Sequence, residues 1–268
     1  MKDIAELTRL EGRVALVTGG AGHIGSVMAD AFAECGARPV ILDLRSETAT
    51  TTAEDIAARR GVEALGLGVD LADETSVRSV PDRIIDHFGR LDVLVNCAAL
   101  GGTSELKGWA VPFLQQSSDS WRMALEVNLT APFVLTQVCA PALGDSGHGS
   151  VINIGSIYGI SGPDMRLYGE VPTLGNPAAY AASKGGLTQL TRWLATVLAP
   201  KVRSNAISVG GVWRHHAEDF VDRYASRTPL GRMATEEDLK GAAVYLASDL
   251  SAYVTGHNLV VDGGWTAW

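Results

Sequence analysis

Three side chains in the second half of the chain have types and spacing that suit proton transfer to an alcohol. Tyr180 and Lys184 lie four positions apart in Tyr-Ala-Ala-Ser-Lys, which places both on one face of a helix. A lysine ammonium near a phenol favours the phenolate and lowers the tyrosine pKa, so the phenol can exchange a proton with an alcohol near neutral pH. Ser156 follows a predicted strand and can hold the substrate oxygen. Asn128 is a candidate to anchor a water molecule that connects Lys184 to solvent.

A glycine-rich segment near the N-terminus, Thr18-Gly-Gly-Ala-Gly-His-Ile-Gly25, follows a predicted strand and precedes a predicted helix. In a doubly wound sheet this turn binds a pyrophosphate, because the amides at the start of the helix and the positive end of its dipole face the anion. Glycine lets the backbone approach with no Cβ in the way. We predict a dinucleotide-binding loop, and a simple tight turn is the alternative. The predicted contacts are Gly19, Gly22, His23, Ile24 and Gly25.

Polar residues at the ends of the next strands are candidates for the rest of this site. Asp43 ends the second predicted strand, 18 positions beyond Gly25. A carboxylate there can accept hydrogen bonds from ribose hydroxyls and would repel a 2′-phosphate. This favours NAD over NADP, although nearby Arg45 weakens the preference, and a turn or capping role for Asp43 is the alternative. Asp70 is expected at the adenine edge and Asn96 in the cofactor cleft.

The elements that must position these residues alternate along the chain. Continuous apolar strands indicate burial on both faces, and strict alternation of strand and helix indicates right-handed crossovers. We therefore predict an α/β fold, a doubly wound parallel sheet of about seven strands, as one domain over residues 1–268, with long substrate loops at about 100–119, 157–178 and 211–230. The predicted strands are 14–18, 39–42, 64–69, 91–95, 151–154, 202–207 and 258–261; the helices are 24–35, 48–60, 73–88, 120–143, 179–198 and 236–246.

Composition limits the partners of the protein. The chain has 268 residues, is 46% hydrophobic and has a formal charge of -8, which argues against nucleic acid or an anionic membrane as a partner. Its three cysteines have no CxxC spacing and are expected to be buried reduced thiols, which fits a cytoplasmic location. The start is too charged for a signal peptide, and no apolar run is expected to span a bilayer. His215-His216 lacks further ligands at matching spacing, so no metal site is predicted.

Together these motifs make the chain resemble a short-chain dehydrogenase/reductase of the single-domain, Tyr-x-x-x-Lys type. The similarity runs from about residue 12 to the C-terminus and includes residues 205–211 and Val-Asp-Gly-Gly at 261–264. The resemblance implies a Rossmann-like fold, a nicotinamide cofactor, a small-molecule substrate and a homotetramer or homodimer. It also implies a catalytic tetrad, with Tyr180 and Lys184 touching the cofactor as well, and further cofactor contacts. The tetrad is Asn128, Ser156, Tyr180 and Lys184; the added contacts are Leu71, Ala98, Gly211 and Val212.

The chain departs from the family pattern at several positions. His23 replaces the usual middle glycine of the loop, and its side chain is expected either over the pyrophosphate or toward solvent. Cys97 replaces an asparagine, and Val209 replaces a proline. Arg214 lies where a threonine often touches phosphate, which puts that contact in doubt. Ser156 and Tyr180 are 24 positions apart, about twice the usual separation, so the insertion 160–177 is expected to form part of the substrate wall.

The loops carry polar and aromatic side chains that favour a hydroxylated, anionic substrate such as a sugar derivative. His23 and the C-terminal ending resemble a branch of gluconate 5-dehydrogenase-like or flagellin-sugar-modifying oxidoreductases. A 3-oxoacyl thioester (ketoacyl) reductase is the alternative enzyme, and a catalytically silent nicotinamide-binding regulatory protein is the alternative of another class. The loop residues considered are Trp109, Asp164, Arg166, Tyr168, Glu170, Trp213, Arg214, His215 and His216.

Overall fold

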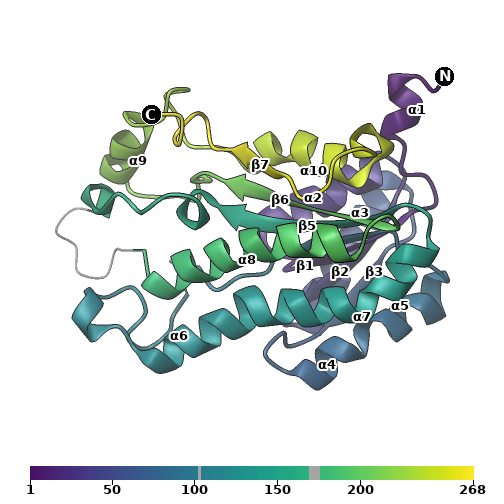
Figure 1. Ribbon diagram of the computed structural model, residues 1–268, viewed down its shortest axis with the longest axis horizontal. Coiled ribbons are helices and arrows are strands. Elements are labelled where there is room, and N and C mark those ends of the chain that lie inside the picture. The colour runs from purple at the N-terminus through teal and green to yellow at the C-terminus, as the bar shows by residue number, and fades with distance from the viewer. Residues whose placement is uncertain (102–103, 169–175) are drawn as a thin grey trace.

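Seven parallel strands form one sheet in the order β3-β2-β1-β4-β5-β6-β7, as the computed structural model shows (Figure 1). The structure describes residues 1–101, 104–168 and 176–268. The order reverses direction at β1 and β4, so the chain winds outward from the middle in both directions and the carboxyl ends of all strands meet at one edge. The predicted doubly wound Rossmann-like sheet is confirmed. The strands are β1 Val14–Thr18, β2 Arg38–Asp43, β3 Leu65–Gly68, β4 Val93–Asn96, β5 Gly149–Ser156, β6 Val202–Val209 and β7 Asn258–Val261.

Both faces of the central strands are covered by helices, because successive side chains of a strand point to opposite sides. Ala15 and Val17 of β1 belong to a core cluster with Phe32 of α2, whereas Val14 and Leu16 belong to a second cluster on the other face. The first cluster packs under α2, α3 and α10, and the second under α4, α5 and α7. These helices are α2 His23–Glu34, α3 Ser46–Arg60, α4 Glu74–Arg78, α5 Val80–Phe88, α7 Ala131–Asp145 and α10 Lys240–Ala247.

Two predicted helices are interrupted in the structure. The helix predicted over 73–88 ends at Arg78 and restarts at Val80, with Pro81 in the first turn of α5, because proline lacks the N–H that would continue the first helix. The helix predicted over 120–143 contains a π-helical segment, Glu126–Thr130, between α6 Ser118–Leu125 and α7. A π-helical turn changes which side chains share a face and often occurs at functional sites; here it carries Asn128.

By length and composition alone, the stretch Ser118–Asp145 could span a membrane. This differs from the expectation that no apolar run would do so. In the structure, however, Leu135, Cys139 and Leu143 of α7 are buried in the core cluster against the sheet. A buried core helix passes the same test of length and apolar composition, so the packing accounts for the apolar sequence.

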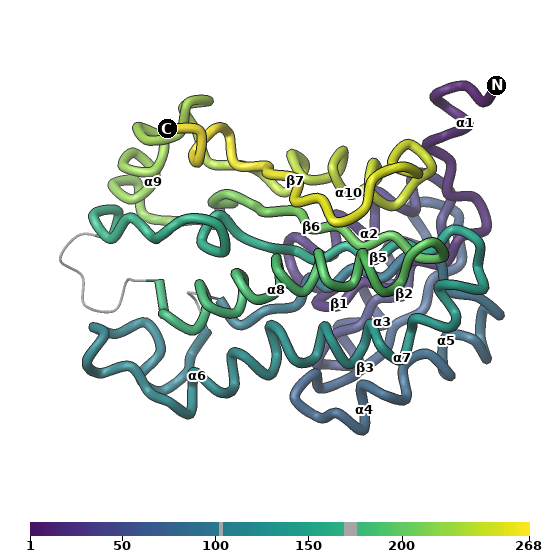
Figure 2. Tube along the Cα trace, in the orientation of Figure 1, coloured from purple at the N-terminus to yellow at the C-terminus, as the bar shows by residue number. Residues whose placement is uncertain are grey.

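The loops that follow β4, β5 and β6 gather at one end of the molecule, on the left in Figures 1 and 2. This end also holds α6, the first turn of α8 Ala178–Val197, α9 Glu218–Ala225 and the C-terminus. Neither α9 nor the N-terminal α1 Ile4–Thr8 was predicted. The segment after β5 is tied to α9, because Arg223 Nε donates to the carbonyl of Leu167 at 2.9 Å and Arg227 pairs with Asp164. The described parts of the three loops predicted to bind substrate therefore lie at the carboxyl edge of the sheet.

Candidate active site

The glycine-rich loop lies against the end of β4. Gly19 has a φ of +61°, and a Cβ there would lie 2.9 Å from the Ala98 Cα. A Cβ on Gly25 would lie 2.2 Å from the Gly19 carbonyl oxygen, so side chains are excluded at both positions. Thr18 Oγ1 accepts the amides of Cys97 and Ala98 at 3.0 and 3.1 Å, which fixes the loop to β4. Among the described residues no side chain caps α2 at Gly22, so its N-terminal amides remain available to an anion.

The predicted adenosine contacts surround this loop. Asp43 ends β2, and its carboxylate accepts the amides of Ala21 at 3.3 Å and Leu44 at 2.9 Å. The carboxylate is therefore held beside the loop and is only partly exposed. Asp70 is exposed after β3 and accepts the Ala72 amide at 2.9 Å, while Leu71 packs partly against the core. The cradle of glycines, the uncapped helix start and the acidic strand end fit a dinucleotide.

His23 is the first residue of α2, and its imidazole is largely exposed. Its Nδ1 lies 3.5 Å from the Glu236 carboxylate, which precedes α10. The side chain was expected either over the pyrophosphate or toward solvent. In the structure the ring points outward, as in the second case, but it also contacts an acidic side chain. The contact joins the phosphate loop to the short helix Glu236–Leu239, which precedes α10.

The side chain of Asn96, expected in the cofactor cleft, lies inside the protein, and a cofactor contact of this residue stays a prediction. Asn96 is 2% exposed, and its amide donates to Asn153 Oδ1 at 2.8 Å and to Thr136 at 3.4 Å. The last residue of a strand still has a side chain directed to one of the two covered faces, so Asn96 links β4 to β5 and α7 inside the protein. Ala98, two residues later, faces Gly19 as described above and remains a candidate cofactor contact.

The backbone N–H and C=O of Val212 have no hydrogen-bond partner within residues 1–101, 104–168 and 176–268. The Ala234 amide donates to the Gly211 carbonyl at 2.9 Å, and the Trp213 amide donates to the Ala234 carbonyl at 2.8 Å. In such a parallel bridge the N–H and C=O of the residue between, Val212, point away from the partner segment. The Gly211 amide, in contrast, donates a hydrogen bond to the Tyr224 hydroxyl at 2.5 Å. The backbone at Val212 can therefore recognise an amide group.

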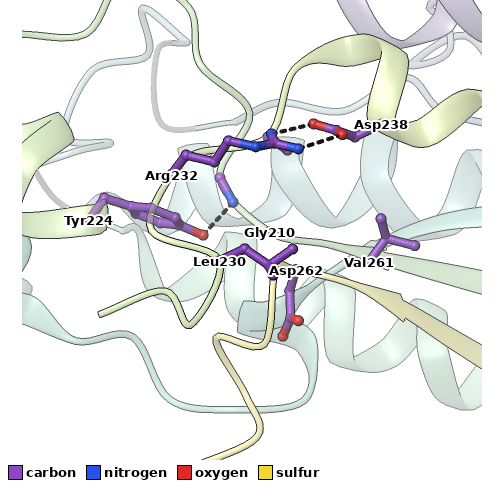
Figure 3. A pocket seen from close by; sticks show the side chains of 10 residues that line it. Gly210, Tyr224, Leu230, Arg232, Asp238, Val261 and Asp262 are labelled. Carbon is purple, nitrogen blue, oxygen red and sulfur yellow. Dashed lines mark hydrogen bonds and ion pairs between the residues drawn. The ribbon is translucent and has the colours of Figure 1, made fainter. Parts of the chain in front are cut away.

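A cavity of about 140 Å³ lies behind this segment and is shown in Figure 3. Its lining includes Gly211 and Tyr224, and the ion pair between Arg232 and Asp238, at 2.6 and 2.8 Å, borders it. Ser156 and Tyr180 do not line it. The cavity therefore lies beside the 210–212 backbone and is not formed by the catalytic residues.

The structure brings together the three side chains predicted to handle the substrate proton. Ser156 ends β5 and is nearly buried, and Tyr180 lies in the first turn of α8, near enough to Ser156 for this side chain to lower the pKa of Tyr180. Lys184, one turn further along α8, is buried with its Nζ 5.8 Å from the centre of the Tyr180 ring. Its ammonium donates to the Ile154 carbonyl at 2.7 Å. One face of α8 thus meets the end of β5, as predicted.

The charge around Tyr180 differs from the expectation. Burial raises the pKa of Tyr180, whereas the Ser156 hydrogen bond and the positive charge of Arg214 lower it. Burial also lowers the pKa of Lys184 to about 8, and the nearby Cys97 acts in the opposite direction. Arg214 is therefore a further cation that favours the phenolate, beside Lys184, whose own charged form is disfavoured by burial. From the sequence, Arg214 was expected in the substrate wall, at a position where the family often has a phosphate-contacting threonine, and not as a partner of Tyr180.

Asn128 is fully buried and uses its whole side chain within the protein. Its Oδ1 accepts the Leu100 amide at 2.7 Å, and its Nδ2 donates to the Leu100 carbonyl at 3.0 Å and to Ser183 at 3.1 Å. These bonds join the π-helical segment to the loop after β4 and to α8, next to Lys184. The side chain thus positions the 98–101 loop and α8, and a role in holding water would fall to its main chain.

Two further residues support the site from behind. Trp109, expected in the substrate wall, is 2% exposed and packs in a cluster with Ala179 and Tyr180. Its indole Nε1 donates to the Gly101 carbonyl at 2.7 Å. Gln116 accepts the amide of Ala178 at 3.1 Å, at the start of α8. The 100–119 loop therefore fixes the start of α8, which a loop-length argument did not reveal.

The remaining wall residues are divided between solvent and ion pairs. Asp164 pairs with Arg166 and Arg227, and Trp213 packs on His215 with ring centres 4.5 Å apart. Glu170 lies outside the described residues. Of the cysteines, only Cys139 is buried, and Cys35 and Cys97 are partly exposed; all three are free.

The fold and site define a nicotinamide-dependent oxidoreductase acting on CH–OH groups, and comparison with known proteins identifies the family. Residues 19–266 match a family model described as enoyl-(acyl carrier protein) reductase. The chain belongs to the short-chain dehydrogenase/reductase family.

Similar proteins act on several alcohols. The chain is 35% identical to a D-threitol dehydrogenase of Mycolicibacterium smegmatis, over 96% of this chain and 94% of that protein. It is 34% identical to a 2,5-dichloro-2,5-cyclohexadiene-1,4-diol dehydrogenase of Sphingobium indicum, over 96% and 98% of the two chains. A 3-oxoacyl-(acyl-carrier-protein) reductase of Aquifex aeolicus is 31% identical over 96% and 98%.

A solved structure with the same fold is similarly close. A gluconate 5-dehydrogenase from Burkholderia cenocepacia, in complex with NADP and tartrate, has a TM-score of 0.87 and 32% identity over 99% of this chain and 100% of that one. The predicted family resemblance, fold class and reaction class are confirmed. The roles of the individual site residues stay predictions.

The close approach at Gly25 leads to a sharp prediction. In Gly25→Ala the new methyl group would lie 2.2 Å from the Gly19 carbonyl, so the loop must shift and dinucleotide affinity should fall about tenfold or more. Fluorescence titration with NADH and NADPH measures this. Gly241→Ala is the matched control, because it is also a helical glycine but has no atom within 4 Å of the added Cβ. Equal affinity in the two variants would contradict the assignment of the loop.

Proposed function

We propose that the protein is a dehydrogenase that prefers NAD and oxidises a secondary hydroxyl of a polyol or sugar derivative, with Tyr180 as the proton acceptor. The observation that carries this proposal is the meeting of Ser156 and Tyr180 at the carboxyl edge of the sheet, with Lys184 5.8 Å from the phenol ring. The glycine cradle lies at the same edge, two strands away.

In the proposed mechanism Ser156 and Tyr180 hold the substrate oxygen by hydrogen bonds. The Tyr180 phenolate accepts the hydroxyl proton during oxidation, and the neutral phenol returns it during reduction. The nicotinamide cofactor, when bound, supplies the hydride acceptor or donor. Fixed placement of these two hydroxyls accounts for much of the rate, because no side chain must be ordered at the moment of reaction. Lys184 would bind the cofactor ribose, as the family resemblance implies, and its ammonium, 5.8 Å from the ring, would stabilise the phenolate once it forms.

A polar substrate is supported by the residues around Tyr180. Arg214 is exposed, forms no ion pair within the described residues and acts electrostatically on the phenol, so it is available to an anionic group. Tyr158 and Tyr168 present hydroxyls from the segment after Ser156. Relatives named for threitol and for a cyclic diol agree with a substrate that carries more than one hydroxyl.

A preference for NAD is supported by Asp43. Its carboxylate is held beside the phosphate loop by two backbone amides, where it would repel a 2′-phosphate. The similar gluconate 5-dehydrogenase has NADP bound. The proposed preference of this protein for NAD over NADP therefore rests on Asp43 alone.

The alternative function is reduction of 3-oxoacyl thioesters, which the similarity to an acyl-carrier-protein reductase favours. We expect the wild-type protein to turn over polyols and keto-sugars with NAD(H) faster than 3-oxoacyl thioesters with NADPH. Initial rates of nicotinamide absorbance change, with each substrate and both cofactors, measure this. Faster thioester reduction with NADPH would reverse the assignment.

We also propose that the protein is a cytoplasmic homodimer or homotetramer. Large apolar side chains are exposed on the helices α6, α7 and α8, among them Trp121, Phe133 and Trp193, the last 53% exposed. Such a group of exposed apolar residues favours burial against a second copy. Sedimentation at micromolar concentration that finds only monomer would contradict this proposal.

A further inference from the structure

Two tyrosine hydroxyls meet next to the catalytic residues. Tyr158 lies in the short helix Ile157–Gly159 directly after Ser156, and Tyr168 ends the short helix Met165–Tyr168. Their oxygen atoms are 3.1 Å apart. Both side chains are half-buried, so the pair is neither part of the core nor free in solvent.

The pair is held in place from several sides. The Tyr158 amide donates to Ser156 Oγ at 3.1 Å, which fixes Tyr158 relative to the residue that binds the substrate oxygen. The Tyr168 ring packs against Phe220 of α9 at 5.9 Å. Its neighbour Leu167 is buried, with its carbonyl bound by Arg223 of α9. A preorganised pair of this kind can recognise a ligand without first being ordered.

Hydrogen bonding within the pair leaves one donor unused. A bond between two hydroxyls consumes one of the two protons, and the other proton has no acceptor among the described residues. Burial raises the pKa of Tyr168, and hydrogen bonds from Tyr158 and Asn176 act in the opposite direction. Either oxygen of the pair can be the donor. When Tyr158 donates to Tyr168, Tyr168 keeps its own proton to give to a ligand.

A free acceptor lies beside this donor. The Oδ1 atom of Asn176 is buried and has no hydrogen-bond partner within the described part of the chain. Leaving a buried polar atom unpaired is costly, so a group that donates to it would be stabilised. Asn176 comes four positions before Tyr180, and Tyr168 is close enough to the phenol of Tyr180 to influence its charge. The free donor and the free acceptor thus both adjoin the reacting centre.

We propose that Tyr168 and Asn176, supported by Tyr158, form a subsite that binds a second substrate hydroxyl on a carbon next to the one that is oxidised. A hydroxyl is both donor and acceptor, so it can satisfy the Tyr168 proton and the Asn176 oxygen together. The subsite makes the enzyme select vicinal diols over mono-alcohols. This inference rests on the proposed function as an alcohol dehydrogenase.

The experiment compares 2,3-butanediol with 2-butanol, which share a carbon skeleton and differ by the neighbouring hydroxyl. The wild-type protein should show the higher kcat/KM for the diol. In Tyr168→Phe the ratio of the two kcat/KM values should fall about 5- to 100-fold, because only the diol loses a hydrogen bond in a buried place. Asn176→Leu should lower the same ratio. Tyr253→Phe, at a fully exposed tyrosine, is the matched control and should leave the ratio unchanged.

The outcomes separate this inference from the proposed function. If the wild type oxidises diols but Tyr168→Phe and Asn176→Leu leave the diol to mono-alcohol ratio unchanged, the subsite is refuted and the proposed function stands. The subsite is also refuted if both variants lower kcat/KM for the diol and for the mono-alcohol by the same factor, as a structural defect would. If the wild type oxidises neither alcohol and reduces 3-oxoacyl thioesters, both proposals fail.

Discussion

Replacing Tyr180 by Phe is expected to lower kcat at least about a thousandfold, because the variant has no group to accept or return the substrate proton. The ring itself is retained, so its packing with Trp109 and Ala179 should persist. The dissociation constant for the nicotinamide dinucleotide should change far less than kcat. Steady-state kinetics and fluorescence titration of the same preparation measure the two effects.

Tyr245→Phe is the control for this variant, because Tyr245 is partly buried in α10, away from the carboxyl edge. It should retain wild-type turnover. A Tyr180→Phe protein with a tenth or more of wild-type activity would exclude the proposed proton acceptor. A wild type that is inactive on a broad panel of alcohols and ketones, yet binds the dinucleotide, would instead support the silent regulatory protein.

The pH dependence of the wild-type rate has a definite sign. Burial raises the pKa of Tyr180, opposed by the Ser156 hydrogen bond and by Arg214. Oxidation requires the phenolate, so its rate should rise with pH through this pKa, whereas reduction requires the neutral phenol and should fall. In Tyr180→Phe this dependence should be absent from the residual rates.

The second large effect is expected at Asp43. In Asp43→Asn the ratio of kcat/KM with NADP to that with NAD should rise about 10- to 100-fold. Two unit charges about 4 Å apart interact by roughly 1 to 4 kcal/mol between bulk water and a protein surface, and the substitution removes this repulsion of a 2′-phosphate. The amide oxygen of asparagine can still accept one of the two backbone hydrogen bonds that now hold the carboxylate. The loop should therefore keep its shape.

Glu47→Gln provides the matched control for charge. Glu47 is exposed in the first turn of α3, four positions beyond Asp43, and its loss changes net charge equally. It should alter the cofactor ratio less than threefold, since exposed charges are screened by salt over about 8 to 10 Å. A wild type that already prefers NADP, or equal effects of the two variants, would show that Asp43 does not select the cofactor.

Features that depend on neighbouring residues in the sequence, such as the strands, were predictable. The strands are apolar throughout because both faces are covered, so their positions and their parallel arrangement followed from the pattern. Helix continuity was less predictable. The break at Ser79 comes from Pro81 in the next turn, and the π-helical turn carries Asn128. Apolar periodicity extends across both and reveals neither.

The direction of each polar side chain at the sheet edge was not predictable. Asp43 and Asn96 both end strands, yet Asp43 faces the phosphate loop and Asn96 lies in the interior between β4 and β5. A shift by one residue reverses the face that a strand side chain occupies. The register of neighbouring strands decides it, and the register depends on residues far apart in the sequence.

By itself, the sequence determined the fold class, the dinucleotide loop and the helical Tyr180–Lys184 pair, because each depends on residues within a few positions of one another. Only the tertiary structure decided that Arg214 also acts on Tyr180 and that Tyr158, Tyr168 and Asn176 lie near it. Electrostatic and hydrogen-bond effects depend on distance and burial in space. Loops after β5 and β6, joined through α9, set those distances.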